Sequence, residues 1–305
     1  MIALLAPGQG SQTPGMLGPW LALPGAHARV AQWSTAAGLD LERLGTTATA
    51  EEITDTAVTQ PLVVALALLA YEELDRRHGV RPGTLTAGHS VGEIAAAAIA
   101  GVFSADDAVA LSAVRGAAMS AACAAEPTGM SAVLGGDAEE VLDRLTELGL
   151  TAANRNATGQ VVAAGRLEAL EALEQNPPEK ARIRKLSVAG AFHTSFMASA
   201  QEAVAARAAE ITPADPIRPL LSNADGARLD DGAEVLRRLV TQVTNPVRWD
   251  LCMATMAASH VSALVELPPA GALVGMAKRE MRGTPTVALK TPDDIAALDQ
   301  LAVSR

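Results

Sequence analysis

The chain has 305 residues, and its 49% hydrophobic content is enough to bury a large core, in one large domain with an insertion or in two domains. The formal net charge of −10 argues against nucleic acid as a partner. Aromatic residues make up only 2% of the chain, so we expect a core built from Ala, Leu, Val and Ile.

Two features bear on the compartment. Cys123 and Cys252 are too few for a disulfide or metal framework, which favours core or free thiols in a reducing environment. The N-terminus lacks the basic segment of a signal sequence, and the longest apolar run, residues 61–71, is shorter than the roughly 20 residues of a membrane span. We therefore expect a cytoplasmic protein that has no membrane partner.

The first element expected in chain order is a buried strand at residues 2–6. It leads into the loop 7–12, PGQGSQ, which contains Gln9 and has the glycines needed for a close backbone approach. The loop matches neither the phosphate-loop nor the dinucleotide-binding pattern, and a plain turn explains it equally well. Residues 13–59 are expected to be loop-rich, with a helix at 61–78 that ends near Gly79.

The segment 88–92 has the pattern G-x-S-x-G, with Ser90 at its centre. It follows a short apolar run and precedes an expected helix at 94–102, which is the strand–turn–helix context of a nucleophile elbow. A helix N-terminus favours negative charge, so the amide of Val91 is a candidate donor to an oxyanion. The alternative is a glycine-bounded turn with an ordinary serine. A further helix is expected from residue 105, with Ser104 as its N-cap.

The middle of the chain has a different pattern. Strands are expected at 130–134, 151–154, 160–164 and 181–188, with helices at 137–148 and 167–175. This β-α-β-β-α-β order is typical of a ferredoxin-like unit. We expect a small inserted ferredoxin-like domain at residues 128–188, with 1–127 and 189–305 forming a large α/β domain around a mostly parallel sheet.

An activated serine requires a base, and five histidines are candidates. His89 adjoins Ser90, but neighbours in a tight turn usually diverge. His193 lies where the chain returns to the large domain, which places it ahead of His260. No acidic partner is evident, so a Ser–His dyad with the imidazole held by a backbone carbonyl fits as well as a triad.

Six motifs in order then resemble those of acyl-CoA:acyl carrier protein acyltransferases. They are PGQGSQ at 7–12, GHSVGE at 88–93, RGAAM at 115–119, the segment 156–165, GAFHTSFM at 190–197 and NPVRW at 245–249. The chain is most similar to malonyl-CoA:acyl carrier protein transacylases, the discrete enzymes of fatty acid or polyketide synthesis. One loop departs from the family pattern: residues 266–273 read ELPPAGAL where the family has E-x-G-P-G-x-x-L.

The resemblance implies an α/β-hydrolase-like core and a ping-pong transfer of malonyl from malonyl-CoA to acyl carrier protein. Ser90 would be the nucleophile, and His193 the base and then the acid. The amides of Gln9 and Val91 would form the oxyanion hole. A main-chain carbonyl around residues 247–248 would orient the imidazole. No resident cofactor or metal is implied, and a monomer is expected.

Substrate-binding roles follow from the same resemblance. Arg115 would pair with the malonyl carboxylate, although without the family a helix-surface arginine would be the simpler reading. Phe192 would crowd a methyl-bearing acyl group and favour malonyl over methylmalonyl. Asn154 and Asn156 would contact CoA or the acyl group, or form a plain Asx turn.

Docking of an acidic carrier protein requires local positive charge. The candidates are a group at 180–185 (Lys180, Arg182, Arg184 and Lys185) and a group at 278–282 (Lys278, Arg279 and Arg282), either of which can also be a solvated face. The alternative functions are a serine hydrolase or thioesterase, a binding module with an inactive serine, and a trans-acting polyketide acyltransferase.

Overall fold

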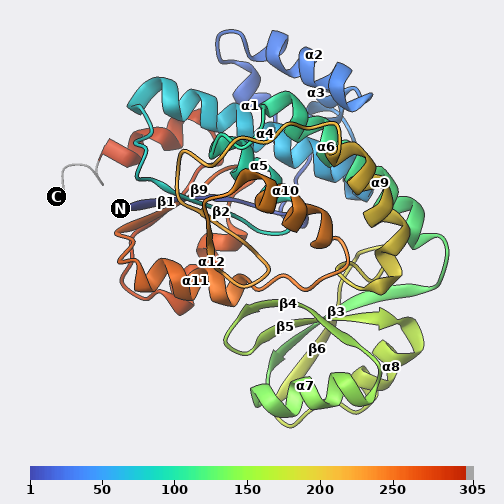
Figure 1. Cartoon of the computed structure of the whole chain (residues 1–305). Coiled ribbons are helices and arrows are strands. Elements are labelled where there is room, and N and C mark those ends of the chain that lie inside the picture. The colour runs from blue at the N-terminus through green and yellow to red at the C-terminus, as the bar shows by residue number, and fades with distance from the viewer. Residues whose placement is uncertain (300–305) are drawn as a thin grey trace.

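Short strands and longer helices alternate along most of the chain (Figure 1). The computed structural model describes residues 1–299. The end of the predicted large-domain range, residues 300–305, lies outside the described residues. The fold is of the α/β type and contains two sheets, one mostly parallel and one antiparallel.

The larger sheet has six strands in the order β10-β9-β1-β2-β7-β8. The strands are β1 (Ile2–Ala6), β2 (Leu85–Gly88), β7 (Leu220–Leu221), β8 (Arg228–Leu229), β9 (Ala263–Glu266) and β10 (Thr286–Ala288). All neighbours pair in parallel except β7 and β8. The expectation of a mostly parallel sheet is therefore confirmed, with β8 as an antiparallel strand at one edge.

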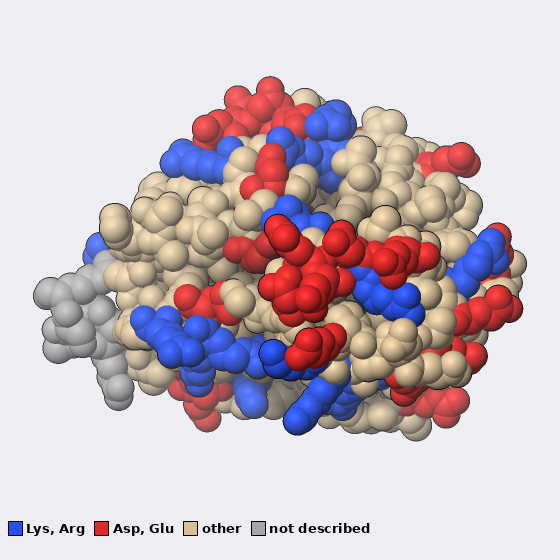
Figure 2. All heavy atoms as spheres, turned by 90° about the horizontal axis from the view of Figure 1, so that it is seen from below, with Lys and Arg blue, Asp and Glu red and all other residues tan. Residues whose placement is uncertain are grey.

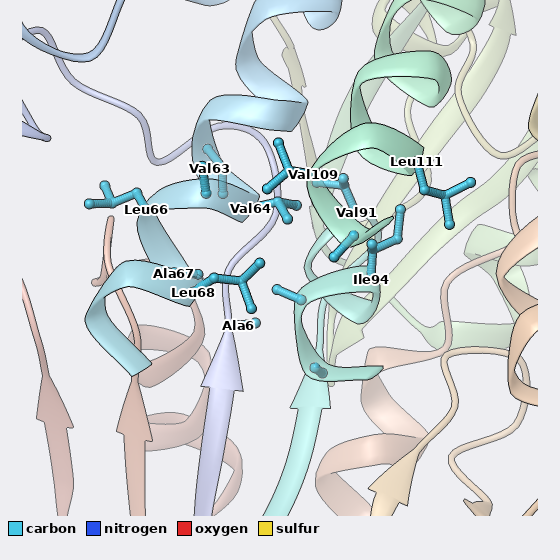
Figure 3. Packing of buried hydrophobic residues seen from close by; sticks show 14 of the residues in the cluster. Ala6, Val63, Val64, Leu66, Ala67, Leu68, Val91, Ile94, Val109 and Leu111 are labelled. Atoms are coloured by element: carbon cyan, nitrogen blue, oxygen red, sulfur yellow. The ribbon is translucent and has the colours of Figure 1, made fainter. Parts of the chain in front are cut away.

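Helices cover both faces of this sheet (Figure 1). Successive side chains of a strand point to opposite faces, and β1 shows the consequence. Leu4 and Ala6 join the core beneath α4 (Thr56–His78), α5 (Gly92–Ile99) and α6 (Ala105–Cys123), as Figure 3 shows in part. Ala3 and Leu5 join a second core against α11 (Trp249–Ala258) and α12 (Ala272–Glu280). Burial on both faces explains the continuous apolar run in this strand.

Helix α4 begins at Thr56, before the predicted start at residue 61, so Pro61 lies inside it. The N-cap is Asp55, whose carboxylate accepts a hydrogen bond from Ala57 N. Helix α4 is long and apolar enough to cross a membrane when judged by length and composition alone. However, 78% of its most apolar window is buried inside the structure, as in a core helix.

The large-sheet region contains further helices besides these. They are α1 (Gly18–Leu21), α2 (Ala26–Ala37), α3 (Leu41–Thr46), η1 (Glu52–Thr54), η2 (Ser195–Met197), α9 (Ala198–Ala208), α10 (Gly232–Thr241) and η3 (Pro292–Ala296). The core is mostly aliphatic, as expected, but Trp20, Trp33 and Trp249 are all fully buried within it.

The smaller sheet comes from the middle of the chain and lies below the larger one in Figure 1. Its elements are β3 (Thr128–Gly135), α7 (Ala138–Glu147), β4 (Thr151–Ala157), β5 (Gln160–Arg166), α8 (Leu167–Gln175) and β6 (Ala181–Lys185). The strand order is β4-β5-β3-β6, with antiparallel neighbours throughout. Helices α7 and α8 pack on this sheet around a separate hydrophobic cluster.

Strand β4 joins the two parts of the structure. Val247 donates a backbone hydrogen bond to Ala153 O and accepts one from Arg155 N, each 2.9 Å long. The hairpin that follows β4 is held by Glu280 of α12, which accepts hydrogen bonds from Thr158. These contacts fix Asn154 and Asn156 beside the turn after β2.

Candidate active site

Ser90 lies at the apex of a sharp turn between β2 and α5, with a φ of +53°. A left-handed conformation is unusual for a residue with a side chain and requires support from the surrounding structure. The flanking glycines permit the turn. A Cβ on Gly88 would lie 2.0 Å from Gly92 O, and a Cβ on Gly92 would lie 2.2 Å from Ala6 O. The G-x-S-x-G pattern therefore follows from the packing of this elbow.

His193 contacts Ser90 directly. The distance from Ser90 Oγ to His193 Nε2 is 2.8 Å, and His193 Nδ1 lies 2.8 Å from the main-chain oxygen of Gln242. A carbonyl oxygen can only accept a hydrogen bond, so Nδ1 carries the proton and Nε2 is free to accept from the serine hydroxyl. The prediction of a carbonyl around 247–248 was wrong: α10 ends at Thr241 and leaves the Gln242 carbonyl at its C-terminal end for the imidazole.

Burial lowers the pKa of His193 to about 3, and the positive charge of Arg115 adds to this effect. The imidazole is therefore neutral at neutral pH. Like Ser90, His193 has a left-handed backbone, with a φ of +60°. The pair thus has the geometry and the protonation state of a nucleophile and its general base.

Arg115 projects from α6 into the same site and is only 1% exposed. Its Nη1 donates to Gln60 Oε1 at 2.6 Å, and its Nη2 donates to Gln242 Oε1 at 3.1 Å and to Ser90 Oγ at 3.3 Å. Its Nε has no hydrogen-bond partner in the described part of the chain. Burial lowers the pKa of Arg115 to about 10, which still leaves it charged at neutral pH.

No carboxylate forms a salt bridge with Arg115 in the part of the chain that the structure describes. Buried charges are normally paired, because removing a charge from water is costly. A buried guanidinium with spare donors beside a nucleophile is therefore suited to an anionic substrate group.

Behind Arg115 lies a buried polar network that the sequence did not predict. Gln242 Nε2 donates to Glu93 Oε2 at 2.5 Å, and Asn223 N donates to Glu93 Oε1 at 3.2 Å. Burial raises the pKa of Glu93 to about 8. Glu93 was noticed only as a letter of the elbow motif. Gln60 offered one signal, as an amide directly before the apolar run at 61–71, and Asn223 another, at the C-terminal end of a parallel strand.

These side chains surround a cavity of about 180 Å³. Its polar lining includes Gln9, Gln60, His89, Ser90, Arg115, Asn154, Asn156 and His193, and its apolar lining includes Val91, Met119, Met130, Val162, Leu186, Val188 and Phe192. Every predicted site residue therefore reaches this cavity.

The loop residues and asparagines occupy defined places in the cavity. Gln9 is held by a hydrogen bond from its Nε2 to Thr56 Oγ1 at 3.2 Å. Within residues 1–299, neither the amide N–H of Gln9 nor that of Val91 donates a hydrogen bond. Asn156 Oδ1 lies 2.8 Å from His89 Nε2, so His89 is engaged by the small sheet rather than by Ser90.

The remaining histidines lie away from the cavity. His27 contacts Glu42 at 3.0 Å, and His78 lies 3.7 Å from Asp299. His260 follows α11 and does not line the cavity. The structure therefore supports His193 over His260, and both cysteines are free thiols.

Comparison with known proteins now identifies the family. The pattern that defines the acyl transferase domain matches residues 4–291. The chain belongs to the acyl transferase family. This acyl transferase is 64% identical, over 99% of both chains, to a malonyl CoA-acyl carrier protein transacylase of Mycobacterium tuberculosis. It is 34% identical to the protein of that name from Escherichia coli K12, over 98% of this chain and 99% of the relative.

Solved structures agree with this assignment. A crystal structure of MCAT from M. tuberculosis superimposes on this acyl transferase with a TM-score of 0.95 and 64% identity, over 97% of this chain and 99% of the other. A malonyl-transacylase solved in complex with a type II PKS acyl-carrier protein superimposes with a TM-score of 0.91 and 29% identity, over 98% and 99%.

Proposed function

We propose that this protein transfers a malonyl group from malonyl-CoA to the phosphopantetheine thiol of an acyl carrier protein. The observation that carries the proposal is a neutral His193 in contact with Ser90, beside a buried Arg115 that has no carboxylate partner among residues 1–299. The names of its relatives point to the same reaction.

The first half-reaction loads the serine. His193 Nε2 takes the proton of Ser90 Oγ as that oxygen attacks the thioester carbonyl. The tetrahedral intermediate collapses with cleavage of the C–S bond, and His193 returns the proton to the departing CoA sulfur. The product is a malonyl ester of Ser90.

The oxyanion of the intermediate would be stabilised by the main-chain N–H groups of Gln9 and Val91. Both belong to cavity-lining residues, and both amides are free within the described residues. Val91 is also the N-cap residue of α5, where the helix dipole favours negative charge.

The second half-reaction unloads the serine. The pantetheine thiol of the carrier protein gives its proton to His193 Nε2, and the thiolate attacks the malonyl ester. The C–O bond breaks, and Ser90 Oγ recovers the proton. The reaction needs no resident cofactor: CoA leaves with the first product, and the pantetheine belongs to the partner.

Selectivity for malonyl is assigned to Arg115 and Phe192. Arg115 would bind the free carboxylate through the donors that its amide partners leave available. Phe192 is 7% exposed and lines the cavity beside His193, where it would limit space next to the acyl carbon. Asn156 would contact the substrate from the position in which its hydrogen bond to His89 holds it.

The serine hydrolase alternative is less well supported. Triad hydrolases orient the histidine through a carboxylate, whereas here the Gln242 carbonyl does so. A hydrolase that acts on uncharged acyl groups would also have no use for the buried charge of Arg115.

We further propose that residues 1–127 and 189–305 form an α/β-hydrolase-like catalytic domain and that 128–188 form an inserted ferredoxin-like domain. The β-α-β-β-α-β order, the four-stranded antiparallel sheet and its separate hydrophobic cluster support this division. We expect a cytoplasmic monomer.

Carrier-protein docking is assigned to the basic group at 180–185, defined by Lys180, Arg182, Arg184 and Lys185. All four residues are exposed, and the chain runs directly from them to Leu186 and Val188, which line the cavity. Positive side chains are visible among the negative ones on the face seen in Figure 2, so an acidic protein still offers local positive surface.

The experiment is a partition assay. The protein is incubated with malonyl-CoA and holo carrier protein, and malonyl-carrier protein and free malonate are measured together. The proposal predicts that malonyl-carrier protein is the main product. Malonate as the main product, with carrier protein present, would favour the hydrolase.

A further inference from the structure

Asn223 is completely buried where the chain leaves β7, next to the Ser90 elbow. We propose that Asn223 is the positioning residue that holds the nucleophile elbow in its reactive shape. The role of Asn223 in malonyl transfer rests on the proposed function. The effect of Asn223 on the reactivity of Ser90 can be measured without a thioester.

The side-chain amide of Asn223 holds the elbow on both sides. Its Oδ1 accepts a hydrogen bond from Ser90 N at 2.8 Å, and its Nδ2 donates one to Gly88 O at 2.7 Å. The two backbone partners fix the orientation of the amide, because one can only donate and the other can only accept. The amide thus ties together the residues before and after His89 and stabilises the left-handed φ of Ser90.

The backbone of Asn223 is anchored as well. Its N–H donates to Glu93 Oε1 at 3.2 Å, and its carbonyl accepts from Arg248 N at 2.7 Å. Its Oδ1 also accepts from Gln242 Nε2 at 3.3 Å. The Gln242 main-chain oxygen orients His193. One buried side chain therefore connects the nucleophile to the residue that holds its base.

This bonding has a consequence for the oxyanion. The N–H of Ser90 is engaged by Asn223 and cannot donate to the tetrahedral intermediate. That leaves the amides of Gln9 and Val91 as donors. Asn223 acts on the Val91 amide indirectly, because it fixes the two peptide units before Ser90 and so holds the residue whose backbone angles direct the next peptide unit.

The test measures the reactivity of Ser90 with a fluorophosphonate, which labels activated serines and requires neither CoA nor carrier protein. Asn223→Ala is expected to slow labelling by about 10- to 100-fold, because small misplacements of a reacting group have effects of this size. The matched control is Asn176→Ala, which changes an exposed asparagine at the end of α8 in the small sheet. It should label at the wild-type rate.

A second variant separates positioning from a general packing defect. In Asn223→Asp, a neutral carboxyl can accept from Ser90 N and donate to Gly88 O, whereas a carboxylate cannot donate. Labelling by this variant, relative to wild type, should therefore fall as pH rises, while Asn223→Ala remains uniformly slow.

Other titratable and charged groups lie near this position, and all variants share them. Glu93 and Cys252 face Asn223, at the ends of hydrogen bonds from its N–H and its Nδ2. Arg248 donates through its main chain, and Arg115 and His193 lie beyond Gln242. Arg238 lies near Glu93. Division by wild type at the same pH removes the pH dependence that the variants share with it. Asn223→Ala adds no titratable group and reports any change in the titration of these neighbours.

Slow labelling of Asn223→Ala together with the pH-dependent loss in Asn223→Asp supports the proposal. Wild-type labelling of a folded Asn223→Ala overturns it. If Asn223→Ala does not fold, the aspartate variant decides, and a pH-independent ratio to wild type overturns the proposal. Wild-type protein that labels normally but fails to take malonyl would refute the proposed function and leave the role of Asn223 intact.

Discussion

Replacement of Arg115 by alanine provides a quantitative test of substrate recognition. The guanidinium has five N–H donors, of which three serve Gln60, Gln242 and Ser90. The remaining two, including that on the unpartnered Nε, are available to a carboxylate. Removing one partner of a buried ion pair costs about 3–5 kcal/mol. At about 1.4 kcal/mol per tenfold change, this cost predicts that kcat/KM for malonyl-CoA falls by roughly 10²- to 4 × 10³-fold.

Acetyl-CoA has no free carboxylate and is the internal comparison. Acetyl transfer should change by less than about tenfold, because the acetyl group makes no ion pair with Arg115 that the substitution could remove. The charge of Arg115 also lowers the pKa of His193. A bound malonyl carboxylate would offset this charge and make the base stronger, which adds to the preference for malonyl.

The assay measures kcat/KM for both thioesters in wild type, Arg115→Ala and the control Arg144→Ala. Arg144 lies on α7 of the small sheet and pairs with Glu147. The control should behave as wild type with both substrates. Equal losses of malonyl and acetyl transfer in Arg115→Ala would refute a carboxylate-binding role and leave Arg115 as a structural residue.

Further predictions concern specificity, stability and docking. Phe192→Ser should raise the ratio of methylmalonyl to malonyl transfer, and an unchanged ratio would remove Phe192 from the selectivity argument. Burial raises the pKa of Glu93 to about 8, so the folded state holds a proton between about pH 4.5 and 8 that the unfolded chain releases. Wild type should therefore lose thermal stability relative to Glu93→Gln as pH rises through that window, and a constant difference in Tm would contradict the burial argument. Charge reversal of Arg182 and Arg184 should raise KM for carrier protein while single-turnover acylation by malonyl-CoA is unchanged. The matched reversal of Arg279 should have little effect, and the opposite pattern would assign docking to the group at 278–282.

The sequence predicted the nucleophile and the base for physical reasons that are local. The glycines around Ser90 report a turn that only glycine can make, and His193 stands at a break between elements. The alternation of strands and helices predicted the parallel sheet, because burial on both faces leaves continuous apolar runs such as that of β1.

Other parts of the site could not be predicted from the neighbouring sequence, because their roles depend on residues far away in the chain. Arg115 appeared as a helix-surface arginine until the family motifs suggested a role, and it is in fact buried. The carbonyl that orients His193 was assigned to the wrong residue, since any main-chain oxygen can serve and only the end of α10 decides which one does. Asn223 was missed because the two elbow residues that its side chain holds, Gly88 and Ser90, lie more than a hundred positions away in the chain.

The central claim is that Ser90 carries a malonyl group between two thiols. The most direct measurement is the intact mass of the protein after brief mixing with malonyl-CoA, followed by addition of holo carrier protein. Wild type should gain the mass of one malonyl group and lose it to the carrier protein, and Ser90→Ala should gain nothing. Transfer to carrier protein without a mass gain on wild type, or a malonyl adduct on Ser90→Ala, would contradict a malonyl-serine intermediate.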